Sequence, residues 1–308
     1  MTVVASAIIV SYNSARTLAA ALAALRDPGG RVEAIVVDNA SHDGSVAAAR
    51  AAGARIIASG RNVGYARACN LGSEAAVGEV LVFANPDTAV PAATALKAVE
   101  ILVGDPQLGI LGLPRVSEGR YVSRAKRAPT LAWLVREVVG IEARPIDPPR
   151  GAALVEADWV PGSAFAIRRD LYREVGGMDA AIFLYFEDVD LGDRVRAHGR
   201  RVAELTDPAF AIAHAESGHA NYHSRMKLYA WHRACAQYFE KRGHAPVVVR
   251  TLLAARALVR IAFWSLKRIF GHVSGAAYRQ RLCGYIDVLR FWIGNPPPLP
   301  TDEPRGPA

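Results

Sequence analysis

Four carboxylates crowd into the stretch FEDVDLGD, where Glu187, Asp188, Asp190 and Asp193 lie within seven residues, directly after the apolar run FLYF. Neighbouring carboxylates raise one another's pKa, and apolar surroundings raise it further by desolvation. Such a carboxylate can accept a proton from a substrate, and a pair can hold a cation or a substrate hydroxyl. A solvated acidic helix N-terminus is the other interpretation, because LGDRVRAHG predicts a helix that ends at Gly199.

Two further carboxylates follow apolar runs typical of buried strands. Asp38 follows VEAIVV, and a carboxylate there can accept a hydrogen bond from a nucleobase or a ribose hydroxyl, while the nearby Gly44 lets backbone approach a ligand. Asp87, in NPDT, follows EVLVFA and can hold a Mg²⁺ or Mn²⁺ that bridges diphosphate oxygens. A simple Asn-Pro-Asp turn also explains the second motif.

The elements that must position these residues alternate along the first part of the chain. The apolar pattern predicts strands over 3–10, 32–37, 54–58 and 79–84, and helices over 15–26, 44–52 and 64–76. Such alternation predicts an α/β fold with a mainly parallel, Rossmann-like sheet flanked by helices and with ligand sites at the carboxyl ends of its strands. No GxGxxG follows the first strand and no P-loop motif is present, which argues against these two nucleotide sites.

The rest of the chain predicts three kinds of segment. Residues 115–152 are rich in Arg and Pro and show no strand pattern, which predicts a loop and a short helix, either a substrate lid or a plain connector. ADWVPGSAFAIRRDLYREVGGMD predicts strand, turn, strand and helix before the acidic cluster. We therefore expect an α/β domain over 1–223, a helical region over 224–294 and a Pro-rich disordered tail over 295–308.

Taken together, the order of SYNS, VVDNASHDGS, NVGYARACNLG, FANPDT and VPGSAFAIRRDLYREVGGMDAAIFLYFEDVDLGDRVRAHG resembles an inverting family 2 glycosyltransferase of the GT-A fold, in the style of bacterial rhamnosyltransferases. The resemblance covers about residues 5–220. It implies the GT-A nucleotide-diphospho-sugar transferase fold, here with a C-terminal helical extension. It also implies a nucleotide diphosphate sugar donor of the dTDP or UDP type.

The resemblance assigns nucleotide-sugar contacts to residues of four motifs. They are Ser11, Tyr12, Asn13, Asp38, Arg61, Asn62, Gly64, Asn70, Asn85 and Asp87. The family's DxD metal motif maps onto Asn85-Pro86-Asp87; Asn85 stands where the first Asp often lies, which leaves Asp87 as the expected ligand of Mg²⁺ or Mn²⁺. His214 matches a His that completes the metal site in some members, although a strand-end His is also common as a structural residue.

The family's ED motif maps onto Glu187-Asp188. The resemblance implies that Asp188 is the general base that deprotonates the acceptor hydroxyl, while Glu187 holds the acceptor or orients the base. One displacement then inverts the anomeric configuration without a covalent intermediate. Trp159 and Gly162-Ser163 precede this loop and are expected either to line the acceptor pocket or, for the Trp, to lie in the core.

Composition sets the expected location. The chain has 308 residues, 51% of them hydrophobic, and three cysteines without metal-type spacing, Cys69, Cys235 and Cys283. This predicts a globular protein of a reducing compartment. The N-terminal apolar run lacks a basic flank and is too short for a signal peptide or a membrane span, so we expect a cytoplasmic protein.

Charge is divided unevenly between the two ends. Residues 1–220 contain 23 Lys and Arg against 25 Asp and Glu, whereas residues 221–308 contain 14 against 4. In VVVRTLLAARALVRIAFWSLKRIF, helical spacing places Arg256, Arg260 and Lys267 on one face, with Trp264 among the apolar residues. This predicts a helix lying on the inner face of the plasma membrane, or one packed on the catalytic domain. Nucleic acid is not an expected partner.

The function predicted from these observations is transfer of a sugar, with rhamnose expected, to a hydroxyl of a cell-surface glycan or lipid-linked acceptor. A noncatalytic nucleotide-sugar or glycan-binding module is the alternative from another class. A sugar nucleotidyltransferase needs a Gly-rich, basic loop after the first strand, and SYNSARTLAAAL offers only Arg16.

Overall fold

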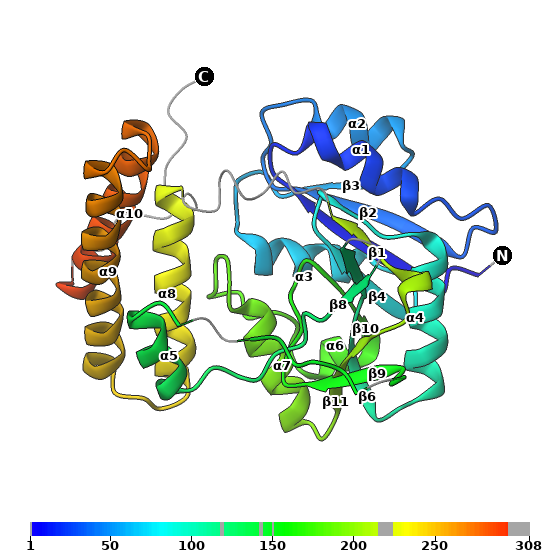
Figure 1. Ribbon diagram of the computed structural model, residues 1–308. Helices are drawn as coiled ribbons and strands as arrows, with labels where there is room; N and C mark the ends of the chain where they lie inside the picture. Colours follow the sequence, from blue (N-terminus) through cyan, green and yellow to red (C-terminus); the bar gives the residue numbers. More distant parts are fainter. Residues whose placement is uncertain (1, 118–119, 142–143, 150, 215–223, 295–308) are drawn as a thin grey trace. The chain divides into compact units, whose positions relative to one another are not determined.

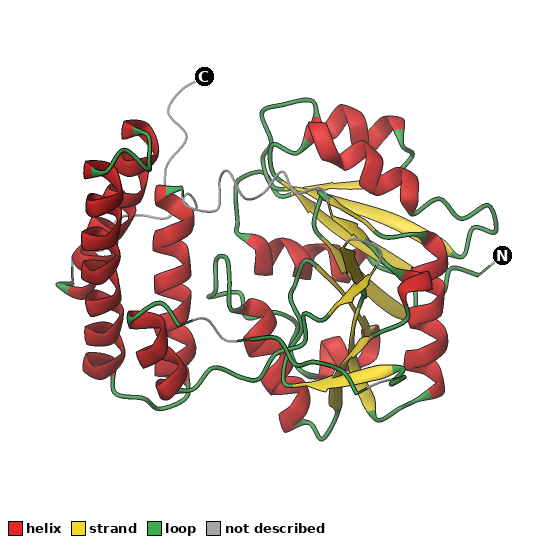
Figure 2. Cartoon of the chain, viewed as in Figure 1, coloured by secondary structure: helices red, strands yellow, loops and turns green. Residues whose placement is uncertain are grey.

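The computed structural model describes residues 2–117, 120–141, 144–149, 151–214 and 224–294 (Figure 1). The chain divides into two compact units. Unit 1 comprises Met1–Ala128, Arg144–Ala181 and Glu187–Ala215, and unit 2 comprises Pro129–Ala143, Ile182–Phe186 and Glu216–Ala308. Strands lie in unit 1, whereas the described elements of unit 2 are helices (Figure 2).

Unit 1 is built on an eight-stranded sheet with the order β3-β2-β1-β4-β10-β6-β11-β9. Its strands are β1 (Ala5–Ser11), β2 (Val32–Asp38), β3 (Arg55–Ala58), β4 (Val80–Ala84), β6 (Leu108–Gly112), β9 (Leu154–Ala157), β10 (Ala164–Arg168) and β11 (Arg201–Leu205). The pairs among β1, β2, β3 and β4 are parallel, as is β6 with β11. β10 runs antiparallel between β4 and β6, and β9 runs antiparallel to β11.

Both faces of this sheet are covered by helices, so its central strands are apolar on both sides. Ile8 and Val10 belong to the core on one face, and Ala7 and Ile9 to the core on the other. The covering elements are α1 (Ala15–Ala24), α2 (Ser45–Ala51), α3 (Tyr65–Ala75), α4 (Ala92–Gly104), α6 (Arg169–Glu174), α7 (Glu187–Ala197) and the short 3₁₀ helix Pro208–Phe210. The strands and helices predicted over residues 3–84 are confirmed within a few residues.

Two small ribbons complete unit 1. β5 (Thr88–Ala89) pairs antiparallel with β12 (Ala213–His214), and β7 (Arg115–Ser117) pairs antiparallel with β8 (Arg120–Val122). The prediction that residues 115–152 contain no strand was therefore wrong. Val116 and Tyr121 lie opposite each other in the β7–β8 register and stabilise this ribbon as a cross-strand pair. The surrounding arginines interrupt the apolar pattern, so the sequence alone did not indicate a strand.

Unit 2 contains α5 (Leu131–Val138), α8 (Arg225–Lys241), α9 (Pro246–Ile269) and α10 (Gly275–Trp292). Serine side chains begin two of these helices: Ser224 accepts a hydrogen bond from Lys227 N, and Ser274 accepts one from Ala277 N. α8 and α10 approach closely, because a Cβ added at Gly284 would lie 3.0 Å from Leu228. The helices predicted over 224–294 are confirmed, and two segments from earlier in the chain join the same unit.

The cations of α9 do not form one exposed face. The Arg256 side chain is 13% exposed and contacts Glu137 Oε2 at 3.3 Å, His232 Nε2 at 3.0 Å and the Trp231 ring at 4.5 Å. Burial, followed by the Arg256 charge, lowers the pKa of His232 to about 3, so this imidazole is neutral. Placing Arg256 on a solvent-facing cationic stripe was wrong, because helical spacing gives its angle and not what covers it.

This buried pair yields a stability prediction. Arg256→Met leaves the Glu137 carboxylate buried without its cation, and we expect the free energy of unfolding to fall by about 3 kcal/mol in urea titrations followed by circular dichroism. Arg250→Met is the matched control, because Arg250 and Glu240 pair on the same helix unit with side chains 33% and 23% exposed. Its expected cost is below about 1 kcal/mol. Equal costs for the two variants would contradict this account.

Candidate active site

The acidic cluster of α7 separates into two pairs with different surroundings. Asp190 contacts Arg194 Nε at 2.8 Å, and Asp193 pairs with Arg196, so these two carboxylates have cationic partners on their own helix. Glu187 and Asp188 make no ion pair with any residue that the structure describes. The solvated helix terminus therefore does not describe Glu187, which is only 5% exposed.

Asp188 is held by backbone. Its Oδ2 accepts a hydrogen bond from Gly162 N at 2.8 Å, and its Oδ1 accepts one from Val189 N at 2.9 Å. Burial raises the pKa of Asp188, while these N–H groups and the charge of Lys126 act in the opposite direction. The result is an oriented carboxylate whose proton affinity is higher than that of an exposed aspartate, which is what a general base needs.

Glu187 lies beside this base in a more apolar place. Burial raises its pKa well above the ordinary value, and the Asp188 charge raises it further. One of its carboxylate oxygens, Oε2, has no hydrogen-bond partner among the described residues. A buried acceptor without a partner is costly to the fold and is available to a substrate hydroxyl.

Helix α3 supplies two more neighbours of the pair. Tyr65 donates a hydrogen bond from its hydroxyl to Gly162 O at 2.9 Å, and burial raises its pKa, as do the charges of Glu187 and Asp188. Cys69 is also buried, and its pKa is raised by burial and by the Glu187 charge. Neither residue was among the predicted catalytic residues, although both lie within the quoted motif NVGYARACNLG.

The backbone is strained at the two residues directly before Glu187 and Asp188. Tyr185 and Phe186 have φ values of 71° and 64°, in the left-handed region that residues with a Cβ rarely adopt. Two such residues in succession are typical of a loop held in place for function.

The predicted nucleotide residues gather at the carboxyl ends of β1 and β2. Ser11 lies directly opposite Asp38 in the β1–β2 register, and the Ser11 hydroxyl has no hydrogen-bond partner among the described residues. The two loops that follow interlock, because Asn13 N donates to Ser41 Oγ at 3.0 Å and His42 N donates to Asn13 Oδ1 at 2.8 Å. Tyr12 is 45% exposed on this loop.

The third nucleotide motif joins this group through Asn39. Asn39 Nδ2 donates to Asn62 Oδ1 at 2.9 Å, and Asn62 Oδ1 also accepts from Gly64 N at 3.1 Å. Arg61, in the same loop, is exposed. Asn70 lies further along α3, where its amide contacts Tyr172 Oη at 2.6 Å and Met178 O at 2.8 Å, so the structure gives it partners inside the fold.

The predicted metal motif follows β4. Thr88 Oγ1 contacts Asp87 Oδ1 at 3.5 Å, and position 214 lies opposite Thr88 in the β5–β12 register, which brings His214 next to the Asp87 segment. The His214 side chain is outside what the structure describes. Among the side chains it describes, no three His, Cys, Asp or Glu gather as a metal site. A carboxylate and an imidazole at neighbouring positions still suit Mn²⁺, with further positions left for diphosphate oxygens.

The metal motif and the base meet at one dipeptide. Asn85 N donates to Ser163 O at 3.0 Å, while Gly162 N donates to Asp188. Gly162 and Ser163 precede β10, and β10 is antiparallel to β4, so its amino end lies at the edge where β4 ends. The structure thus brings together the residues predicted for a metal, for a nucleotide and for a base along one edge of the sheet.

This geometry can be compared with known proteins. The family model described as Glycosyl transferase family 2 matches residues 6–176, more than half of the chain. The chain belongs to glycosyl transferase family 2. It is 31% identical over 222 residues to the N-acetylglucosaminyl-diphospho-decaprenol L-rhamnosyltransferase of Mycobacterium tuberculosis. The aligned region covers 65% of this chain and 72% of the relative. The protein is therefore a glycosyltransferase.

Solved structures of this class share its fold. A mannosyltransferase from Pyrobaculum calidifontis in complex with GDP-Man and Mn²⁺ has a TM-score of 0.55 at 19% identity, over 96% of this chain and 87% of that one. GalNAc-T7 with UDP, GalNAc and Mn²⁺ has a TM-score of 0.55 at 16% identity, over 69% and 44% of the two chains. The predicted GT-A fold with a C-terminal helical extension is confirmed.

The buried glutamate yields a prediction on pH. Between the ordinary carboxyl pKa of 4.5 and the raised pKa of Glu187, the unfolded chain loses a proton that the native state retains, so the stability of the wild type falls as pH rises through this window. Glu187→Gln removes that loss. We expect its melting temperature at pH 7.5 to exceed the wild type's by about 2–5 °C, and the difference to shrink towards pH 5.

The control is Glu156→Gln, because Glu156 has a side chain 53% exposed and pairs with Arg201 at the surface. Its melting temperature should follow the wild type's across the same pH range. A Glu187→Gln variant that is less stable than the wild type at pH 7.5 would contradict the prediction that the buried Glu187 lowers the stability of the wild type as pH rises.

Proposed function

We propose that the protein is an inverting glycosyltransferase that moves a sugar from a nucleotide diphosphate donor to an acceptor hydroxyl. The observation that carries this proposal is Asp188, an oriented, half-buried carboxylate without an ion-pair partner in the described chain, in a member of family 2. Asp188 removes the proton of the attacking hydroxyl, and Glu187 accepts a hydrogen bond from the acceptor. Attack and departure then occur in one displacement on opposite faces of the anomeric carbon.

The donor is expected at the other end of the site. Ser11, Tyr12, Asn13 and Asp38 receive the nucleoside, helped by the loop of Arg61, Asn62 and Gly64. The amide of Asn70, on α3, is instead engaged by Tyr172 and Met178. Two observations favour this placement of the nucleoside. The Ser11 hydroxyl has no hydrogen-bond partner in the part of the chain that the structure describes, and Ser11 lies opposite Asp38 in the β1–β2 register. We infer a dTDP or UDP sugar as the donor.

Asp87 and His214 would hold a Mg²⁺ or Mn²⁺, with Asn85 beside them. The β5–β12 register that brings these positions together supports the assignment. When bound, the metal neutralises the charge that develops on the leaving nucleoside diphosphate. The side chains supply the other two functions: Asp87 orients the donor, and Asp188 takes the proton of the acceptor hydroxyl.

The sugar and the acceptor are inferred from the relative. The name of the Mycobacterium tuberculosis relative specifies transfer of L-rhamnose to N-acetylglucosaminyl-diphospho-decaprenol. We propose rhamnose as the sugar and a lipid-linked glycan of cell-surface polysaccharide synthesis as the acceptor. A binding module without catalysis is the alternative function. An Asp188→Asn variant that loses turnover but still binds the donor would identify the protein as an enzyme and exclude this alternative.

The donor and base assignments are tested together by a panel of UDP, dTDP and GDP sugars with Mn²⁺ or Mg²⁺, read by thermal shift. We expect one nucleotide class to raise the melting temperature only with metal, and Asp87→Ala to abolish this shift. Asp188→Asn should keep the shift and lose turnover by about 10³-fold. A Asp188→Asn variant with wild-type turnover would eliminate Asp188 as the base, and a metal-independent shift would eliminate the metal assignment.

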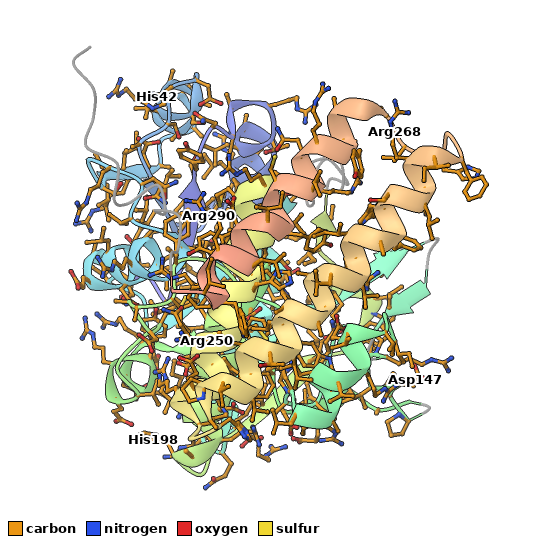
Figure 3. All side chains as sticks on the ribbon, turned by 90° about the vertical axis from the view of Figure 1, so that its left-hand side faces the viewer. His42, Asp147, His198, Arg250, Arg268 and Arg290 are labelled. Atoms are coloured by element: carbon orange, nitrogen blue, oxygen red, sulfur yellow. The ribbon has the colours of Figure 1, made fainter. Side chains whose placement is uncertain are left out.

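We also propose that unit 2 contacts a membrane surface, which would place the enzyme on the cytoplasmic face of the plasma membrane. Val259, Phe263, Leu266 and Phe270 lie within about 60° of one another around α9 and are 41% to 70% exposed. Arg260 and Lys267 lie along one side of this apolar stripe and complement anionic lipid. Figure 3 views the unit with α9 and α10 in front. Among the described residues, none of the helices combines the length and the hydropathy of a transmembrane span.

The stripe is tested by Phe263→Glu combined with Leu266→Glu in co-sedimentation with phosphatidylglycerol vesicles. We expect the wild type to sediment with the vesicles and the variant to bind at least about tenfold more weakly. Val247→Glu is the control, because Val247 is 67% exposed on another face of α9. A wild type that stays in the supernatant would overturn the membrane proposal.

A further inference from the structure

The segment that contains β7 and β8 has a charge that the proposed chemistry does not use. Residues 115–127, RVSEGRYVSRAKR, contain five cations and one acid. They belong to unit 1, as do Asp188 and the edge of the sheet described above. Cations next to a catalytic base are expected either to be solvated or to bind an anion. The contacts of Arg124 and Lys126 distinguish these two possibilities.

The backbone at Arg124 is fixed by a buried carboxylate. Glu204, on β11, is 1% exposed, and its Oε1 accepts hydrogen bonds from Tyr121 Oη at 2.6 Å and from Arg124 N at 3.0 Å. Burial raises the pKa of Glu204, so placing this group in the fold is costly. In return, the hydrogen bonds of Glu204 hold the segment that follows β8 in one position on the sheet.

Lys126 is fixed as firmly. Its N–H donates to Trp159 O at 3.1 Å and its carbonyl accepts from Asp158 N at 2.9 Å, while its ammonium lies 5.3 Å from the centre of the Trp159 ring. Three residues beyond Trp159 is Gly162, whose N–H holds Asp188. This path places the Lys126 charge near the base, where it lowers the pKa of Asp188.

The carboxylates of Glu204 and Asp188 act on the Arg124 guanidinium by charge, but neither is a hydrogen-bond or ion-pair partner of the Arg124 or Lys126 side chain in the described chain. Neither the Arg124 guanidinium nor the Lys126 ammonium donates a hydrogen bond or forms an ion pair within the described chain. Arg124 is half-buried, and burial lowers its pKa. A guanidinium that has lost water without gaining an acceptor is suited to a planar, two-point contact with a phosphate.

We infer that Arg124 and Lys126 bind the diphosphate that links the acceptor sugar to its lipid, beside Asp188. The inference rests on the proposed function and adds to it the group by which the acceptor is recognised. The ligand class is a sugar diphosphate ester. Its sugar hydroxyl would reach Asp188, while its diphosphate would take the hydrogen bonds that Arg124 and Lys126 lack.

Sheet order favours the acceptor over the donor as the source of this diphosphate. Glu204 lies on β11, which is five strands from β2 and three from β4, or about 24 Å and 14 Å at the usual spacing. The donor is expected at the ends of β1, β2 and β4. The segment fixed by Glu204 lies on the other half of the sheet, and Asp188, held at the amino end of β10, lies between that segment and the donor strands.

The test is direct binding by isothermal titration calorimetry, because this readout does not require turnover. The probes are N-acetylglucosaminyl diphosphate with a short alkyl chain and the neutral alkyl glycoside of the same sugar. For Arg124→Met combined with Lys126→Met, we expect the Kd for the diphosphate probe to rise at least about tenfold and the Kd for the neutral glycoside to change less than about twofold. Arg124→Lys, which keeps the charge but not the fork, should lie between.

Arg127→Met is the matched control, because Arg127 follows Lys126 directly and its side chain is 68% exposed, next to Asp158. It should leave both Kd values unchanged. Thermal shift by the donor, measured on each variant, reports whether the fold and the donor site are intact.

Three results would overturn the inference: a wild type that binds the two probes equally, a double variant that loses both alike, or a double variant that loses the donor shift instead. Failure of the proposed function looks different. In that case the wild type transfers no sugar from any donor. Calorimetry would still show that the Arg124→Met, Lys126→Met double variant binds the diphosphate probe more weakly than the wild type does.

Discussion

The hydrogen bond from Gly162 N to Asp188 is the contact on which the geometry of this site depends. It fixes the carboxylate through backbone, which has fewer alternative positions than a side chain. A Cβ at Gly162 would lie 3.4 Å from the Asp188 Cβ, an ordinary van der Waals contact, so this position contributes its backbone N–H rather than the absence of a side chain. The next residue accepts a hydrogen bond from Asn85 N, so the base and the proposed metal motif are tied to one dipeptide. The antiparallel direction of β10 is what brings that dipeptide to the edge where β4 ends.

The site is also where the fold gives up stability. Asp190 and Asp193 have arginine partners, whereas the adjacent Glu187 and Asp188 are desolvated without one in the described chain. Both faces of the sheet are covered by apolar cores that can offset this cost. Raised carboxylate pKa values are a direct result of that desolvation, so the same physical cause that destabilises the native state also makes the base effective.

The sequence was informative where a local pattern determines the outcome. Apolar runs predicted β1, β2 and β4, and the rule that parallel strands end at one edge placed Ser11 and Asp38 together. It was silent on Glu204, whose contact with Arg124 joins residues 80 positions apart, since no local pattern encodes such a pair. The same limit explains Arg256, whose helical angle was available but whose contacts with α5 and α8 were not.

The charges around Asp188 suggest how acceptor binding and base strength are linked. In the free protein, burial raises the pKa of Asp188, and the nearby Lys126 lowers it. An acceptor diphosphate bound by Arg124 and Lys126 would neutralise that cationic influence and place negative charge nearby, and both effects raise the pKa of Asp188. The carboxylate would then become a stronger base at the moment when the hydroxyl it must deprotonate is in place. A neutral acceptor would present its hydroxyl to Asp188 without this change, so the cations that recognise the diphosphate would favour the correct acceptor in the chemical step as well as in binding.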